Sequence, residues 1–295
     1  MGERLRVGAL LVCLGAAGAA GCGTDATTEA DLAVLDRPCA EGTQSGSLKL
    51  IFAAPRNTGG YTVFRGSVFD HSMIERTTVG DTEGACALHY ASGATLCDTD
   101  ISLPTGMCPT GNAHTVGTVQ VAGLAHTMTV QPGAYSPSYD SGLDSSLAPV
   151  APGRAIEMTA SGAAGYGPFT LAGRGIAPLT ERIDELPLAA GAPLTVTWDN
   201  PGQPGPARVT VSVYLNTNGA NGYPPTDGYD YLSCDVPDTG TATVPASLLT
   251  TLRARGFSPY PFVALSRRTV DSTTVGPGCV EFSVESVTTQ PLALN

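Results

Sequence analysis

The chain has 295 residues, and its 15 basic and 26 acidic residues give a formal net charge of −11 at pH 7. A charge of this sign and size argues against a nucleic-acid partner, because phosphate binding depends on clustered lysine and arginine. Lys49 is the sole lysine, which indicates a composition bias rather than a binding site, and the negative charge itself favours solubility.

The first 21 residues have the three parts of a secretory signal: a positively charged start, an apolar run over residues 7–20, and small residues before Cys22. The run is too short to span a membrane as a helix, which needs about 20 predominantly apolar residues. The stretch "AAGC" resembles a bacterial lipobox, although Ala19 stands where that motif usually has leucine. We therefore expect residues 1–21 to be a lipoprotein signal peptide and Cys22 to be lipidated. The alternative is ordinary cleavage near Ala20, which would leave Cys22 as a stray thiol.

Residues 22–38 are rich in threonine, aspartate and alanine and lack aromatic side chains. Such a segment cannot bury enough apolar surface to offset the entropy of ordering it, so we expect a flexible tether. Each buried CH₂ of an acyl chain contributes about 0.8 kcal/mol, so a multiply acylated Cys22 would hold the protein at a membrane. In enteric bacteria an aspartate directly after the lipidated cysteine favours the inner membrane. Gly23 occupies that position here, which favours the outer membrane. The sequence does not decide between the periplasmic and the surface-facing side of that membrane.

Six of the eight cysteines remain once Cys13, inside the signal, and Cys22 are set aside. An even number in an exported chain predicts disulfides. The six are Cys39, Cys86, Cys97, Cys108, Cys234 and Cys279. Cys234 and Cys279 stand alone in the C-terminal part, so we expect them to pair and the other four to form two further bridges. No C-x-x-C spacing occurs and no histidine lies at ligand spacing from a cysteine, so we expect no metal site.

Short runs of alternating apolar and polar residues follow the tether, separated by many of the 36 glycines and 23 prolines. This period of two predicts antiparallel strands with one face in water, and the lack of interleaved helices predicts β-sandwiches. The expected strands lie at 47–52, 61–69, 115–123, 155–160, 169–173, 193–199, 207–215, 231–236 and 280–286. One helix is expected over 244–256, where Leu248, Leu249 and Leu252 form an apolar stripe and Gly256 ends the pattern.

The predicted fold class is therefore all-β, with two β-sandwich domains, the C-terminal one immunoglobulin-like with one short helix. The first domain, a disulfide-containing sandwich, is expected over residues 39–177 and the second over 178–295. The boundary is placed where a proline-marked segment leads into a short strand, a tight turn and a strand that ends at Trp198.

Five stretches of the sequence carry a family resemblance. They are "GTVQVAGL" (117–124), "AIEMTASGAAGYGPFTLAGRGIAPL" (155–179), "PLTVTWDNPGQPGPARVTVSV" (193–213), "LSCDVPDTGTATVPASLL" (232–249) and "GCVEFSVES" (278–286). With the lipobox cysteine, this order resembles a family of exported lipoproteins common in myxobacteria, over most of the mature chain. The resemblance implies a lipid-anchored location and a β-sandwich architecture. It implies no activity, because the matching motifs are strand and turn patterns and the family has no assigned reaction.

The sequence lacks the motifs of several enzyme classes. No G-x-S-x-G, H-E-x-x-H or phosphate-binding G-x-x-x-x-G-K-[ST] pattern occurs. A histidine beside an acid could act as a general base, and Asp70, His71 and Glu75 offer one such group and His89 another. Spacing alone does not distinguish such a general base from an ordinary surface or strand-edge histidine. The same interpretation applies to His114 and His126. We expect no catalytic residue and no cofactor.

The stretch "NTNGANGYPPTDGYDY" at 216–231 is the most suggestive loop. Its asparagine and aspartate oxygens could bind calcium, and its tyrosines could stack on a sugar or a peptide, but it lacks the full EF-hand pattern. Loops at the end of a rigid sandwich often carry binding. The candidate binding residues are Asn216, Asn218, Asn221, Tyr223, Asp227 and Tyr229. The polar loop at 135–146 is a weaker candidate of the same kind.

These observations predict a non-enzymatic, lipid-anchored protein of the cell envelope that binds a protein or glycan through its loops, with a membrane but no nucleic acid among its partners. The alternative is an envelope hydrolase acting on polysaccharide or peptide, which would need two carboxylates about 5–9.5 Å apart in a groove. A purely structural subunit of an envelope assembly is a third possibility, and it predicts an exposed strand edge or a broad apolar patch.

Overall fold

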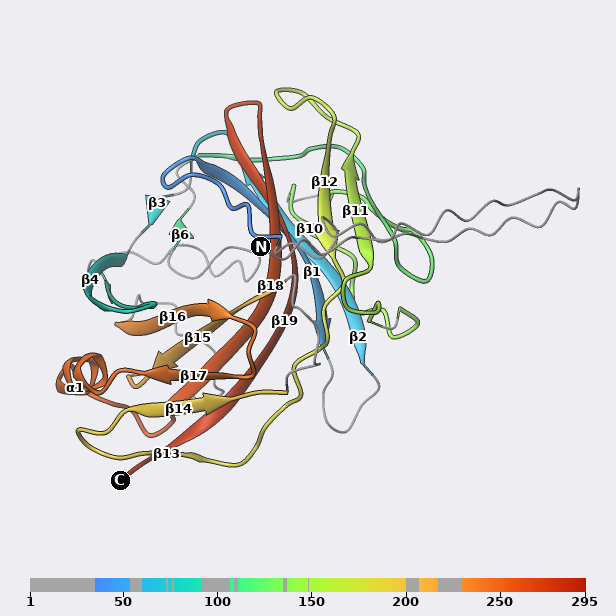
Figure 1. The fold of residues 1–295 in the computed structure, drawn as a ribbon. Helices are drawn as coiled ribbons and strands as arrows, with labels where there is room; N and C mark the ends of the chain where they lie inside the picture. The colour runs from blue at the N-terminus through green and yellow to red at the C-terminus, as the bar shows by residue number, and fades with distance from the viewer. Residues whose placement is uncertain are drawn as a thin grey trace, which may run out of the picture.

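A computed structural model describes residues 35–53, 60–72, 74–75, 77–91, 107–108, 111–134, 137–147, 149–199, 207–216 and 230–295. Over these residues the chain is nearly all β with one short helix, which confirms the predicted class (Figure 1). Within the same ranges, no helix has the length and apolar character needed to cross a membrane.

Most expected strands are present, and two of them, β2 and β11, have the predicted bounds. The strands of the N-terminal part are β1 (Gln44–Ala53), β2 (Tyr61–Phe69), β3 (Ile74–Glu75), β4 (Thr77–Glu83), β5 (Cys86–Ala91), β6 (Met107–Cys108), β7 (Ala113–His114), β8 (Val119–Ala122), β9 (Met128–Val130), β10 (Tyr139–Asp140), β11 (Ala155–Ala160) and β12 (Phe169–Arg174). The elements that follow are β13 (Leu186–Leu188), β14 (Leu194–Thr197), β15 (Arg208–Tyr214), β16 (Tyr231–Pro237), β17 (Thr241–Val244), α1 (Ala246–Ala254), β18 (Phe262–Val275) and β19 (Gly278–Leu294).

One large sheet forms the frame of the molecule. Its strand order is β10-β2-β1-β19-β18-β15-β16-β5-β4, with β13 paired to β19 and β7 to β2. The expectation of purely antiparallel sheets is wrong, because β1 and β13 both run parallel to β19. Parallel pairing needs a long connection between the two strands, and a long stretch of chain separates both β1 and β13 from β19. Figure 1 shows the long β18–β19 hairpin running through the centre.

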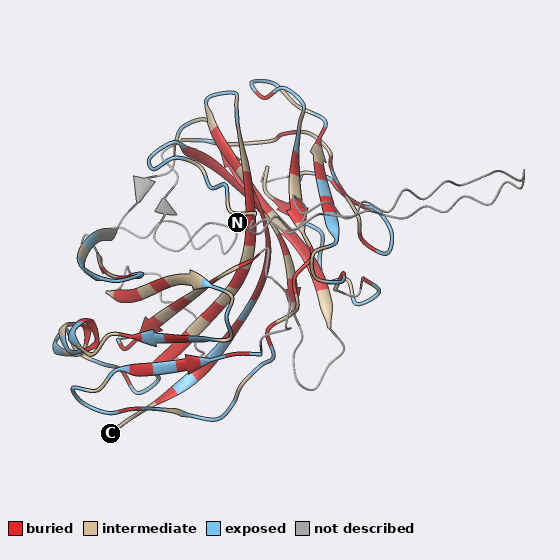
Figure 2. Ribbon diagram, viewed as in Figure 1, coloured by how far each residue is buried: buried red, intermediate tan, exposed pale blue. Residues whose placement is uncertain are grey.

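The first apolar core lies between one end of the large sheet and the four-stranded sheet β12-β11-β8-β9. Leu48, Leu50 and Phe52 of β1 face this core and are fully buried, as their alternation predicts. Residues of β2, β8, β11 and the first half of β19 complete it. The alternation of buried and exposed positions is visible in Figure 2 along strands such as β11 and β14.

The second apolar core lies between the other end of the large sheet and a cover made of β14, β17 and α1. Strands β5, β15, β16 and β18 supply the sheet side. Leu248, Leu249 and Leu252 of α1 are buried in this core, which confirms the predicted stripe. The helix ends at Ala254 with Arg255 as its C-cap, and Gly256 follows with a φ of 107°, a left-handed conformation that suits glycine.

Both cores lie against the same face of β19. Val280, Phe282 and Val284 belong to the first core and Leu292 to the second, and these positions share a face because strand side chains alternate. Strands from both sides of residue 177 therefore belong to one sheet, and each core contains residues from both sides. The structure does not confirm the predicted domain boundary, which stays a prediction.

A polar stripe separates the two cores on this shared face. It consists of Arg267, Thr269 and Asp271 of β18 and Ser286 of β19, all buried. Arg267 is the centre of the stripe, with a side chain that is 1% exposed and a Nε atom 2.8 Å from the Oδ2 atom of Asp238.

Arg267 also donates hydrogen bonds to the main-chain oxygens of Ala177 (2.7 Å) and Asp199 (2.6 Å). The indole nitrogen of Trp198 donates to the carboxylate of Asp238 at 2.7 Å. A buried ion pair is tolerated when most of its polar atoms find partners. The two terminal nitrogens of Arg267 donate hydrogen bonds, whereas its Nε atom is close to Asp238 without a hydrogen bond of good geometry.

The rest of the stripe binds the chain that connects the two cores. Asp271 accepts a hydrogen bond from the main-chain nitrogen of Ala172, and Ser286 accepts one from that of Leu179, both at 2.8 Å. The Thr269 hydroxyl accepts a hydrogen bond from the main-chain nitrogen of Arg174 and donates one to its oxygen, both at 3.3 Å. Side chains of the hairpin therefore satisfy main-chain groups along 172–179, and the connection is fixed to β18 and β19.

The two disulfides seen over the described residues join Cys39 to Cys279 and Cys86 to Cys234. The predicted pairing of Cys234 with Cys279 is therefore wrong. The physical reason is the sheet order: Cys86 on β5 lies directly opposite Cys234 on β16. Each bridge thus joins an N-terminal element to a C-terminal strand. Cys97 lies outside the described residues, and of Cys108 only its place in β6 is described.

Replacing Arg267 by leucine is expected to lower the free energy of unfolding by about 3–5 kcal/mol, because Asp238 would stay buried without its cation. Urea unfolding of the oxidised chain measures this loss. The control is Arg182→Leu, which removes an ion pair with Asp199 in which both side chains are substantially exposed, and about 0–1 kcal/mol is expected. Equal losses in the two variants would contradict the role given to Arg267.

Candidate functional site

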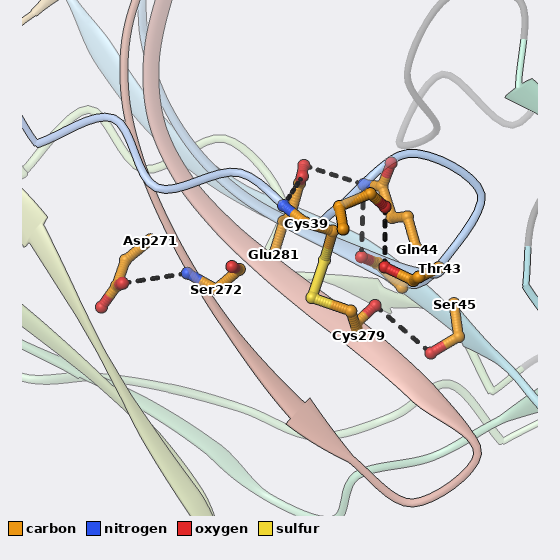
Figure 3. The surroundings of a disulfide bond; sticks show 10 residues. Cys39, Thr43, Gln44, Ser45, Asp271, Ser272, Cys279 and Glu281 are labelled. Atoms are coloured by element: carbon orange, nitrogen blue, oxygen red, sulfur yellow. Dashed lines mark hydrogen bonds between the residues drawn. A yellow bond between two sulfur atoms is a disulfide. The ribbon is translucent and has the colours of Figure 1, made fainter.

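The last residues of the predicted tether, 35–38, are docked on the centre of the large sheet. Their main chain pairs with β18, since the nitrogen of Arg37 donates to the oxygen of Val270 and the nitrogen of Val270 donates to the oxygen of Leu35, both at 2.9 Å. The Cys39–Cys279 disulfide then fixes the segment to β19 (Figure 3).

Polar contacts around this disulfide complete the attachment. Glu281 accepts hydrogen bonds from the main-chain nitrogen of Cys39 (2.7 Å) and the side chain of Gln44 (2.8 Å), as Figure 3 shows. Burial raises the pKa of Glu281, and the hydrogen bond from Cys39 partly offsets that rise. Arg37 binds Asp271 of the polar stripe at 2.9 Å. A pull on the tether would therefore act directly on the β18–β19 hairpin.

The predicted binding loop is described only at its ends. Asn216 is exposed after β15, whereas Asn218, Asn221, Tyr223, Asp227 and Tyr229 lie outside the described residues. The chain is described again from Asp230, which precedes β16. The rings of Tyr214 and Tyr231, near the two ends of the loop, stack with centroids 5.5 Å apart. The loop therefore leaves and rejoins the sheet at adjacent strands.

Two exposed aromatic rings lie beside these loop ends, on the connection from α1 to β18. Phe257 is 59% exposed and Tyr260 is 57% exposed. The connection is fixed to the end of β15 by a hydrogen bond from the nitrogen of Ser258 to the oxygen of Leu215 at 2.8 Å. Both rings are thus held next to the place where the loop begins.

Arg255 links this connection to the far end of the loop. Its Nε atom lies 2.7 Å from a carboxylate oxygen of Asp230, and its guanidinium lies 4.7 Å from the centre of the Tyr90 ring on β5. We call Tyr90, Asp230, Arg255, Phe257 and Tyr260 the aromatic rim. Sequence reasoning missed its exposed rings, although "GFSPY" at 256–260 places two aromatics around a proline between a helix and a strand.

The second predicted loop serves the fold. Residues 135–136 are outside the described part, but Tyr139 is buried and β10 pairs with the edge of β2. The Tyr139 hydroxyl receives a hydrogen bond from the nitrogen of Val116 and donates one to the oxygen of Gly117, both at 2.8 Å. Burial raises the pKa of this phenol. The described part of the segment pairs with the edge of β2, and its Tyr139 ring is not open to a ligand.

The histidines each contact a neighbouring side chain. His71 and His114 lie 4.0 and 3.7 Å from the carboxylate of Asp70, and His126 lies 3.9 Å from Asp144. His89 makes a 2.9 Å hydrogen bond with the side chain of Ser233 and stacks on Tyr231. The side chain of Glu75 is not among those described. No group of three or more histidine, cysteine, aspartate or glutamate side chains in the described ranges is arranged to hold a metal ion.

None of the family models, curated proteins or solved structures compared with this chain matches it significantly. The resemblance to exported lipoproteins of myxobacteria therefore stays an expectation. The function has to be argued from the residues of the chain itself.

Proposed function

We propose that this chain is a non-enzymatic, lipid-anchored protein of the cell envelope that binds a protein or a glycan at the aromatic rim. The observation that carries the proposal is the exposure of Phe257 and Tyr260 on a connection fixed beside the ends of the tyrosine-rich loop. Large rings with one accessible face supply contact area at little cost in side-chain entropy, and they are enriched where proteins bind partners.

The proposed location is supported by the disulfides and by the docked segment. Disulfides form and persist in oxidising compartments, which agrees with export. Thirteen residue steps separate Cys22 from Leu35, and an extended chain of that length spans at most roughly 45 Å. A lipid on Cys22 would therefore keep the body close to the membrane.

The described buried carboxylates favour the binding function over the hydrolase alternative. Asp238 and Asp271 hold the polar stripe together, and Glu285 receives a hydrogen bond from Ser283 and lies 3.4 Å from Lys49. Each of these groups is occupied by a partner that the fold depends on.

Replacing Phe257 and Tyr260 together by alanine is expected to reduce binding to envelopes at least tenfold, because exposed aromatic anchors carry a large share of binding energy. The measurement uses labelled mature protein and isolated cell envelopes in a sedimentation assay. Leu143 and Ile183 are 65% and 60% exposed at other places, so Leu143→Ala with Ile183→Ala is the matched control.

Equal binding by the rim variant and the wild type would overturn the proposed site. Treating the envelopes beforehand with protease or with periodate, which oxidises sugar diols, then separates a protein ligand from a glycan. Absence of envelope binding by the wild-type protein would overturn the binding function as a whole.

Cys22→Ser is expected to move the protein from the membrane fraction to the soluble fraction, because the acyl chains supply the membrane affinity. Membrane fractionation followed by protease treatment of intact cells measures both the attachment and the face on which the protein is displayed. A wild-type protein that is soluble, like the variant, would contradict the lipid anchor and indicate a secreted protein.

A further inference from the structure

The face of the large sheet opposite the two cores is ordered into rows that run across β19, β18, β15 and β16. Strand register places Thr289, Ala264, Ser212 and Ser233 side by side in one row. The next row, two residues further along each strand, contains Val287, Ser266, Thr210 and Asp235. All eight of these residues are partly or fully exposed.

The two rows are mostly small hydroxyl side chains. We call Thr210, Ser212, Ser233, Ser266 and Thr289 the hydroxyl band. The core face of the same strands carries Val211, Val213 and Leu232, all fully buried. The band crosses three gaps between strands, which at the usual spacing corresponds to about 15 Å. It is therefore long enough for several sugar rings of an extended chain.

Larger side chains flank the hydroxyl band on both sides. On the side of the aromatic rim, Phe262, Tyr214, Tyr231 and His89 form a row in which successive rings stack, with centroids 4.9, 5.5 and 4.5 Å apart. Phe262, Tyr214 and Tyr231 of this row are buried, so the rings open to a ligand on this side are Phe257 and Tyr260 of the aromatic rim.

Charged side chains flank the other side, and they neutralise one another. Arg208 lies 2.7 Å from Asp235 and 3.3 Å from Asp36, the residue that the docked segment contributes. Arg268 lies 3.5 Å from both aspartates. Two cations and two anions thus pair with one another within this cluster.

We propose that the hydroxyl band, together with the aromatic rim, binds a neutral polysaccharide whose chain lies across the strands. The inference rests on the proposed function and names its ligand class. Sugar hydroxyls exchange hydrogen bonds with serine and threonine, and the apolar faces of sugar rings pack on aromatic rings. A polyanion would be repelled by a chain with net charge −11. An apolar partner would bury the hydroxyls without giving them hydrogen bonds, which costs free energy.

The test is affinity electrophoresis of the oxidised mature protein in gels that contain a single polysaccharide. Dextran, laminarin and galactomannan are the neutral probes, and alginate and dextran sulfate are the charged ones. The test variant is Ser212→Ala with Ser266→Ala, which removes two hydroxyls from the band. Thr195 and Thr243 are exposed, paired threonines on β14 and β17, so Thr195→Ala with Thr243→Ala is the matched control.

We expect at least one neutral polysaccharide to retard the wild type and the control equally, and its dissociation constant to rise roughly tenfold in the test variant. Retardation only by charged polysaccharides, by none, or to the same degree in the test variant would overturn the inference. If envelope binding is abolished by protease and survives periodate while still requiring Phe257 and Tyr260, the ligand is a protein. In that case the proposed function stands and this inference fails.

Discussion

The buried ion pair of Arg267 and Asp238 lies between two apolar cores that share one hairpin. Arg267 contacts the main chain at Ala177, in the connection between the cores, and at Asp199, just after β14. Burying two charges is costly, and removing one of them would leave the other buried without its partner. The polar stripe therefore brings residues from both sides of the predicted boundary into contact.

The two faces of β18 have different roles. Its odd-numbered residues supply the second core at Val263 and Leu265 and then the polar stripe. Its even-numbered residues form the opposite face, with Phe262 in the aromatic row and Ser266 in the hydroxyl band. The surface proposed for recognition is thus built on a strand that contributes to the second core and to the polar stripe, and the docked N-terminal segment pairs with that strand at Val270.

Period-two alternation predicted the strands well because it reports burial of one face, which is a local property. It located β2 and β11 to the residue, and the leucine stripe of α1 was predicted for the equivalent helical reason. Pairing between distant strands is not local. The parallel β1–β19 pair and the partner of Cys234 depend on which elements become neighbours, and nothing in either strand's own pattern specifies that. The same holds for the candidate site. The position of the loop was predicted from its own residues, whereas the importance of Phe257 and Tyr260 depends on a contact between distant segments, the hydrogen bond from Ser258 to Leu215.

Coupling between the halves can be measured directly, because Trp198 is the single tryptophan and it lies at the ion pair of the polar stripe. Urea unfolding of the oxidised protein should be followed both by tryptophan fluorescence and by the far-ultraviolet circular dichroism of all strands. A single body predicts that the two curves coincide with one midpoint. A circular dichroism curve with two steps, only one of which coincides with the fluorescence change, would contradict the joint cores and support two independent domains.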